Sequence, residues 1–185
     1  KAKLINIRLA KTAQKYNIPM GVGSVRIALR YPELAETFQV RKYAPSVPLM
    51  ANLGASSLND GLSWKECQRA VEMIDADALA LHLNPLQEAL QPGGSTNFQC
   101  LLVKIEEVVK KLKVPVIVKE VGHGIDGKTA RDLYNAGVKI IDTAGTGGTS
   151  WAWIEAKIAG DERAAAAFKD FGLNTYDSIK ACRQV

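Results

Sequence analysis

Short apolar runs alternate with segments of helical periodicity along the chain. The runs are rich in Val, Ile, Leu and Ala, and each predicts a strand; they span residues 20–24, 47–54, 78–84, 114–122 and 138–145. Because strands and helices alternate, we expect parallel strands that are joined by right-handed crossovers through helices. The 185 residues are therefore predicted to form a single α/β domain.

The segments between these runs predict helices, which we expect near residues 1–15, 27–38 with a break at Pro32, 64–74, 98–112, 129–135, after Thr149 and twice in 161–185. Ser63 followed by Glu66 is the sequence signature of a capping box at the start of one of them. Asp126 or Lys128 is expected to open another. Pro85 is expected to end the third strand, with a loop after it.

Polar side chains or glycines stand at the end of nearly every predicted strand. They are Gly23 and Ser24, Asn52, His82 to Asn84, Lys119 and Glu120, and Gly145 onward. An open doubly wound sheet gathers its ligand groups at one switch point, whereas a barrel directs every strand at one mouth. This pattern favours a TIM (β/α)8 barrel. Since a complete barrel needs roughly 250 residues, we expect an incomplete central portion, with an N-terminal segment and the last strands missing.

Charge and cysteine content narrow the possible partners. The net charge of +5 is scattered, which argues against nucleic acid and suits a small anion such as a phosphate ester. Three widely spaced cysteines fit neither a disulfide framework nor a zinc site. No apolar run approaches 18 residues and no signal peptide is recognisable, so we expect a cytoplasmic protein without a membrane span.

One candidate site lies at the end of the third predicted strand. His82 and Asn84 are two positions apart and should point the same way, with Gln87 and Glu88 on the loop that follows. The histidine and the two amides can bind an anion, and Glu88 can hold a divalent cation. Lys119 interrupts an apolar strand, and it can form a Schiff base, hold a phosphate or stabilise negative charge on a cofactor ring.

Two glycine-rich turns add further candidates. Thr149 and Ser150 follow glycines at 145, 147 and 148 and open a helix, whose first amides can bind an anion. Ser24 follows the other turn, and Arg26 can grip a phosphate with its planar guanidinium.

With these residues assembled, the sequence resembles the type II isopentenyl-diphosphate isomerases, FMN-dependent enzymes on a (β/α)8 barrel. The stretches that carry the resemblance are MGVGSVR (20–26), ANLG (51–54), ALHLNPLQE (80–88), QPGG (91–94), PVIVKEVGHG (115–124) and DTAGTGGTSW (142–151). They occur in order through most of the chain. Val25 departs from the glutamine common in the family, and Thr146 stands where a larger, often basic residue is frequent.

The resemblance implies the interconversion of isopentenyl and dimethylallyl diphosphate, with reduced FMN as acid and base, NADPH as reductant and Mg²⁺. It implies FMN contacts at Ser24, Asn52, Lys119 and Thr149, with Lys119 stabilising the reduced ring. It implies substrate contacts at Arg26, His82, Asn84 and Gln87, of which Gln87 and His82 are the catalytic candidates, and a Mg²⁺ ligand at Glu88. It further implies a homo-oligomer, a tetramer or an octamer.

Two other readings stay open. Another FMN-dependent barrel oxidoreductase would use a base such as His82 to take a substrate proton. A non-catalytic phosphate-binding or assembly module would bind ligand without turnover. Because strands would lie outside the chain, we expect the 185 residues alone to lack isomerase activity and to bind FMN weakly.

Overall fold

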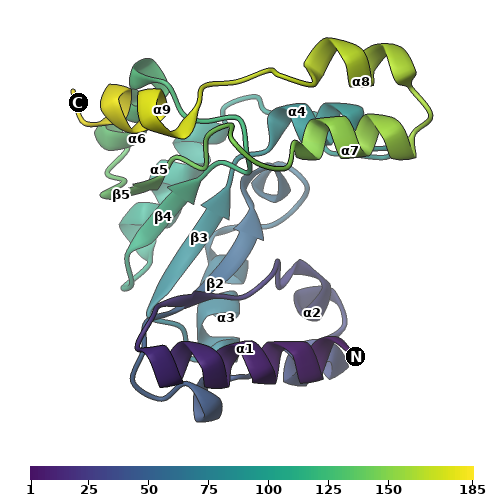
Figure 1. Cartoon of the computed structure of the whole chain (residues 1–185). Coiled ribbons are helices and arrows are strands. Elements are labelled where there is room, and N and C mark those ends of the chain that lie inside the picture. Colours follow the sequence, from purple (N-terminus) through teal and green to yellow (C-terminus); the bar gives the residue numbers. More distant parts are fainter.

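All five strands of the sheet are parallel, and they follow one another in the order of the sequence (Figure 1). The computed structural model describes residues 1–185. The strands are β1 (Met20–Gly21), β2 (Leu49–Gly54), β3 (Ala78–His82), β4 (Val116–Lys119) and β5 (Ile140–Asp142). Each predicted strand is therefore present, although each is shorter than its apolar run.

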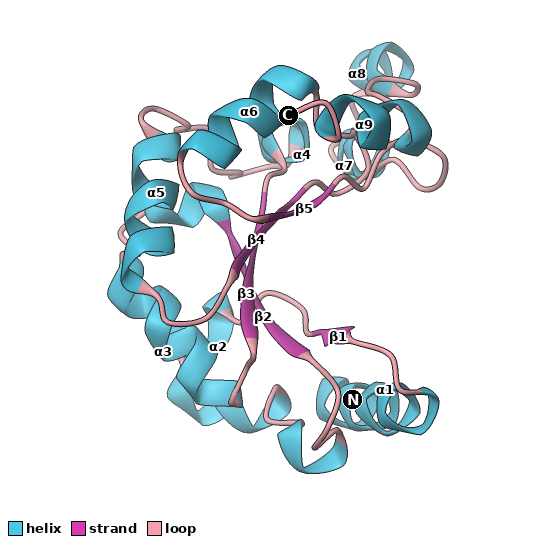
Figure 2. Ribbon diagram, turned by 90° about the vertical axis from the view of Figure 1, so that its left-hand side faces the viewer, coloured by secondary structure: helices cyan, strands magenta, loops and turns pink.

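The sheet is open, so the expected TIM barrel is wrong. The outer strands β1 and β5 each pair with one neighbour, β2 and β4 respectively, and Figure 2 shows a curved sheet with its two edges apart. The sequence argument relied on polar groups at every strand end. A parallel sheet in consecutive order has no switch point, and it also places all its carboxyl ends along one edge, so this pattern does not require closure.

Helices cover the convex face of the sheet. These are α3 (Trp64–Ile74), α5 (Leu101–Lys111) and α6 (Gly127–Asn135) (Figure 2). Alternate strand residues such as Leu79 and Leu81 turn toward this layer and are fully buried. Burying one such leucine stabilises the fold by about 1.5–3 kcal/mol. The intervening residues, among them His82 of β3, face the concave side, which this helical layer does not cover.

The remaining helices flank the sheet. They are α1 (Ala2–Tyr16), α2 (Arg26–Arg30), α4 (Pro85–Leu90), α7 (Trp151–Ile158), α8 (Glu162–Phe168) and α9 (Thr175–Cys182), with short 3₁₀ segments at 32–37, 41–43 and 55–58. The pairs α4 and α7, α7 and α8, and α6 and α9 pack together. The predicted loop after Pro85 is wrong, because α4 begins there. Proline suits the first position of a helix, where its missing N–H costs no hydrogen bond. None of the helices combines the length and the hydrophobicity that a membrane-spanning segment requires.

Two helix starts match their sequence signals. The Ser63 hydroxyl accepts from the amide of Lys65 at 3.2 Å, and Glu66 accepts from the Ser63 amide at 2.8 Å, which confirms the capping box. Hydrogen bonds from Ser63 hold the pKa of Glu66 below its usual value. Asp126 caps α6 by accepting from the amide of Thr129 at 2.6 Å.

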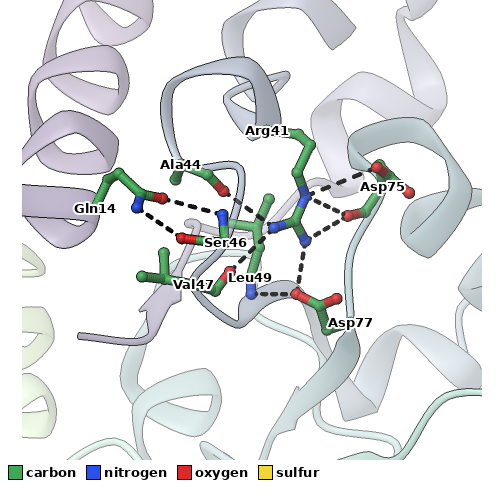
Figure 3. A network of polar contacts seen from close by, with 8 residues as sticks. All are labelled: Gln14, Arg41, Ala44, Ser46, Val47, Leu49, Asp75 and Asp77. Atoms are coloured by element: carbon green, nitrogen blue, oxygen red, sulfur yellow. Dashed lines mark hydrogen bonds and ion pairs between the residues drawn. The ribbon is translucent and has the colours of Figure 1, made fainter. Parts of the chain in front are cut away.

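A network around Arg41 fixes the amino-terminal edge of the sheet (Figure 3). The guanidinium donates to the carbonyls of Ala44, Val47 and Asp75 and to the carboxylate of Asp77 at 2.6 Å. The same Asp77 oxygen accepts from the amide of Leu49 at 2.7 Å. The network therefore ties the start of β2 to the start of β3, at the edge opposite the candidate site.

Candidate functional site

Three neighbouring strands bring polar side chains together at the carboxyl edge of the sheet. His82 lies beside Gly54 of β2 and Lys119 of β4 in the strand register. Its Nδ1 is 2.8 Å from Oδ1 of Asn52. Because an amide oxygen only accepts, Nδ1 carries a proton and donates to Asn52, and in the neutral ring Nε2 is then an acceptor.

The surroundings of His82 favour its neutral form. Burial lowers the pKa of His82, the positive charge of Lys119 lowers it further, and the carboxylates of Glu88 and Glu120 oppose this in part. The ring is therefore a neutral hydrogen-bonding group near pH 7. An anion bound beside it would favour protonation and turn Nε2 into a second donor.

A pocket of about 520 Å³ opens beside this histidine. One wall carries the cationic and hydroxyl groups that bind phosphates in proteins: Arg26 and Arg30 with Ser24 and Ser57. Arg26 donates through Nη1 to Oγ of Ser57 at 3.2 Å. The pocket brings together four of the predicted residues, Ser24, Arg26, His82 and Glu88.

The carboxylate of Glu88 is held in place from two sides. The side-chain amide Nδ2 of Asn84 donates to Oε1 of Glu88 at 3.1 Å, and the backbone amide of Ser95 donates to Oε2 at 2.6 Å. The loop at 91–95 folds so closely onto α4 that a Cβ on Gly94 would lie 2.0 Å from the Glu88 carbonyl oxygen. The fold therefore presents one oriented carboxylate to the pocket.

This carboxylate suits Mg²⁺ only with help from a ligand. No group of three or more His, Cys, Asp or Glu side chains could hold a metal ion. Mg²⁺ is usually bound through one or two carboxylates together with substrate phosphates and water. Glu88 therefore fits a metal that arrives with, or is completed by, a phosphate ligand.

Gln87 has a partner that the sequence did not reveal. Its Nε2 donates to Oε1 of Glu155 on α7 at 2.9 Å, and its Oε1 accepts from Asn84 at 3.2 Å. The amide is thereby fixed between α4 and α7. The only sequence signal for Glu155 is a carboxylate in the helix that follows the glycine-rich turn.

Lys119 and Thr149, the two further predicted site residues, lie in different surroundings. Lys119 is half-buried on the same sheet face as His82, and Nζ donates to the Glu120 carbonyl at 2.5 Å. Thr149 is exposed and does not line the pocket; its carbonyl oxygen lies 3.3 Å from where a Cβ on Gly122 would be. Ser150 caps α7 by accepting from the Trp153 amide at 3.2 Å, as expected for a helix that opens there.

Arginines and hydroxyls beside a fixed carboxylate and a neutral histidine form a polar pocket whose side chains can bind a small anion. The chain is 52% identical over 188 aligned residues to isopentenyl-diphosphate delta-isomerase of Rickettsia africae (strain ESF-5). It is 50% identical to the isopentenyl-diphosphate delta-isomerase of Rickettsia typhi (strain ATCC VR-144 / Wilmington).

Both alignments cover the whole of this chain and 55% of the relative, so the chain spans about half the length of these curated relatives. No protein-family model matches it. Among solved structures, a chain of the crystal structure of the Amycolatopsis orientalis BexX/CysO complex has a TM-score of 0.39 at 16% identity, over 74% of this chain and 48% of that one. That likeness is too low to define a common fold.

Proposed function

We propose that this chain provides the substrate, metal and flavin contacts of a type II isopentenyl-diphosphate delta-isomerase, which interconverts isopentenyl and dimethylallyl diphosphate. The observation that carries the proposal is the pocket that Arg26 and Ser24 line together with the oriented carboxylate of Glu88, beside His82. Relatives named isopentenyl-diphosphate delta-isomerase, about 50% identical over the whole chain, support the isomerase part of this proposal.

The diphosphate would bind against the arginine wall. The Arg26 guanidinium has donors beyond the one used by Ser57, so it can form a forked contact with a phosphate. His82 would donate to a phosphate oxygen once protonated, while Asn52 holds the ring in orientation. Glu88 is the residue that would hold Mg²⁺, which would supply positive charge to offset that of the diphosphate.

The residues that would hold FMN are Ser24, Asn52 and Lys119, together with Thr149 just before the cap of α7. Lys119 fits this role because its ammonium makes one hydrogen bond, to a carbonyl, and keeps two donors for an anionic partner. Reduced FMN, regenerated by NADPH, would supply the proton donor and acceptor at the alkene. Lys119 would stabilise the negative charge on the reduced flavin ring.

Gln87 would position the hydrocarbon part of the substrate. Its amide is fixed by Glu155 and Asn84, so its orientation does not depend on ligand. A group held in this way avoids the entropy cost of ordering when the substrate binds.

The test is calorimetric titration of isopentenyl diphosphate with and without Mg²⁺, comparing Arg26→Met with Arg8→Met. Arg8 is exposed and its side chain makes no hydrogen bond in the structure, so it is a matched loss of one charge. A hydrogen bond between charged groups contributes about 1.5–3 kcal/mol, so Arg26→Met should weaken binding by roughly ten- to hundredfold.

Product analysis under anaerobic reducing conditions, with added FMN, completes the test on a protein that carries this chain within the full length of the curated relatives. The proposal predicts dimethylallyl diphosphate without net consumption of NADPH. Equal affinities for the two arginine variants, or binding that ignores Mg²⁺, would contradict the assigned site. Stoichiometric oxidation of NADPH with turnover would point instead to an oxidoreductase.

A further inference from the structure

The excess positive charge of the chain has an uneven distribution. Lysines and arginines occur throughout, but residues 1–32 contain seven of them and no aspartate or glutamate. The whole chain has 24 cations and 19 carboxylates, so residues 33–185 have a net charge of −2. The net charge of +5 therefore comes entirely from the first 32 residues. Such asymmetry suggests an interaction with an extended anionic partner, a nucleic acid or a membrane.

Most of these cations form a row on the exposed side of α1. Lys3 pairs with Glu36 at 2.7 Å, but the others in this segment are exposed and make no ion pair; they are Lys1, Arg8, Lys11 and Lys15. Positions 1, 8 and 15 are two helical turns apart, and position 11 is one turn from two of them, so these side chains lie along one side of the helix.

An exposed apolar row runs beside the cations. Ile5, Leu9 and Tyr16 are 54%, 53% and 63% exposed, and their spacing of four and seven residues places them on one side of α1. The ammonium of Lys15 lies 5.2 Å from the centroid of the Tyr16 ring, so the two rows adjoin. The helix packs on the 3₁₀ segments that follow α2, and its buried residues are alanines at other positions. The apolar row is therefore not part of the core.

Charge decides whether a second copy of the chain could cover this side of α1. In a two-fold dimer the same patch meets itself, so the cations of one copy would face those of the other. The helix contains no carboxylate to offset them. Like charges brought together in this way oppose association, whereas an anionic surface complements all of them.

The apolar row decides between the two kinds of anionic partner. The phosphates of a nucleic acid attract lysine and arginine, but they offer nothing that would bury exposed isoleucine and leucine side chains. The boundary between headgroups and acyl chains of an anionic membrane accepts both rows of an amphipathic helix.

The position of α1 leaves it accessible to a flat surface. It lies along the bottom of Figure 1, at the end of the molecule opposite α8 and α9. Leu4 and Ile18, which are also about half exposed, extend the apolar surface at its ends. No residue of α1 lines the pocket beside His82, so a ligand there would leave the helix free.

We propose that α1 is a docking helix for an anionic phospholipid membrane, on which it lies parallel to the surface. Ile5 and Leu9 would enter the boundary between headgroups and acyl chains, together with the ring of Tyr16. Arg8 and Lys15, with Lys1 and Lys11, would pair with lipid phosphates. This proposal does not depend on the proposed isomerase function.

Vesicle flotation tests the proposal. Large unilamellar vesicles of phosphatidylcholine alone are compared with vesicles that contain equal parts of phosphatidylcholine and phosphatidylglycerol. The measurement is made on this chain and on a protein that carries it within the full length of the curated relatives. We expect saturable binding of both proteins to the anionic vesicles at about 0.1 M salt, weakened as salt is added. Binding to phosphatidylcholine alone should be at least about tenfold weaker.

Two variants with matched controls locate the binding surface. Leu9→Gln should weaken binding about tenfold, because it removes a side chain that the membrane would bury. Arg8→Gln should weaken it about fivefold, as expected for one cation near an anionic surface. Ile158→Gln on α7 and Lys180→Gln on α9 remove an exposed apolar side chain and an exposed cation elsewhere, and they should change nothing. All four side chains are exposed, so the core is unaffected.

Several results would overturn the proposal. Equal affinity for neutral and anionic vesicles would do so with the native protein alone. Displacement from the vesicles by duplex DNA at equal phosphate concentration, or native affinity in Leu9→Gln, would identify a partner recognised by charge only. Binding by this chain but not by the longer protein would show that other residues cover α1. Failure of the isomerase assay leaves the result unaffected, because α1 lies outside that site.

Discussion

Replacement of Arg41 should destabilise the fold by an amount that follows from its contacts. Its side chain is 20% exposed and donates five hydrogen bonds, four to carbonyl oxygens and one to Asp77 (Figure 3). Arg41→Met keeps much of the aliphatic stem and removes all five donors. The contacts to Asp75 are exposed, so water can replace them.

The carbonyls of Ala44 and Val47 are part-buried, and leaving each without its donor costs about 1 kcal/mol. The Asp77 side chain is 57% exposed, so its ion pair adds only about 0.5 kcal/mol. We therefore expect Arg41→Met to lower the free energy of unfolding by about 2–3 kcal/mol, which for a chain of this size lowers the Tm by roughly 5–10 °C.

Urea denaturation followed by circular dichroism measures this change. Arg69→Met is the matched control, because Arg69 is exposed on α3 and its side chain makes no hydrogen bond in the structure. A loss below about 0.5 kcal/mol in Arg41→Met, the range of ordinary surface changes, would show that the network does not fasten the strand starts.

Three further outcomes follow from the structure. NMR titration of His82 should give a midpoint below its usual pKa of 6.5, because burial lowers the pKa of this side chain. As the pH drops, the unfolded chain then takes up the proton before the folded chain does. The free energy of unfolding should therefore fall between pH 6.5 and that midpoint. A midpoint above 6.5 would contradict this. Burial raises the pKa of Cys67 to about 12, so iodoacetamide at about pH 8 should modify the exposed Cys100 and spare Cys67, as peptide mass spectrometry can check. Glu88→Gln should abolish the Mg²⁺ dependence of diphosphate binding in calorimetry while the Mg²⁺-independent part remains; an unchanged dependence would place the metal elsewhere.

The sequence predicted those parts of the fold that local chemistry decides. The helix Trp64–Ile74 has the predicted bounds, because its capping box involves residues only three apart. Strand ends were predicted less well, since a strand extends only as far as its neighbour can pair. Closure of the sheet could not be predicted, because the polar pattern at the strand ends is the same in an open and a closed arrangement.

In the candidate site too, features that depend on neighbouring residues were predictable, whereas contacts between distant residues were not. His82 lies on the strand that was predicted there, at its last residue. Asn84 is different: the strand ends before it, and its side chain supports Gln87 and Glu88 at the start of α4. The contact between Gln87 and Glu155 joins positions 68 residues apart, and no local pattern reports such a meeting.

The consecutive order of the strands bears on how the chain assembles. Each strand meets a partner that is a single crossover away, so every pairing closes a loop of modest length and low entropic cost. Parallel sheets that interleave distant strands must wait for both segments to be present. Here a growing chain can add one strand and its helix at a time. During synthesis, each later strand can pair with a sheet that β2 and β3 have already begun.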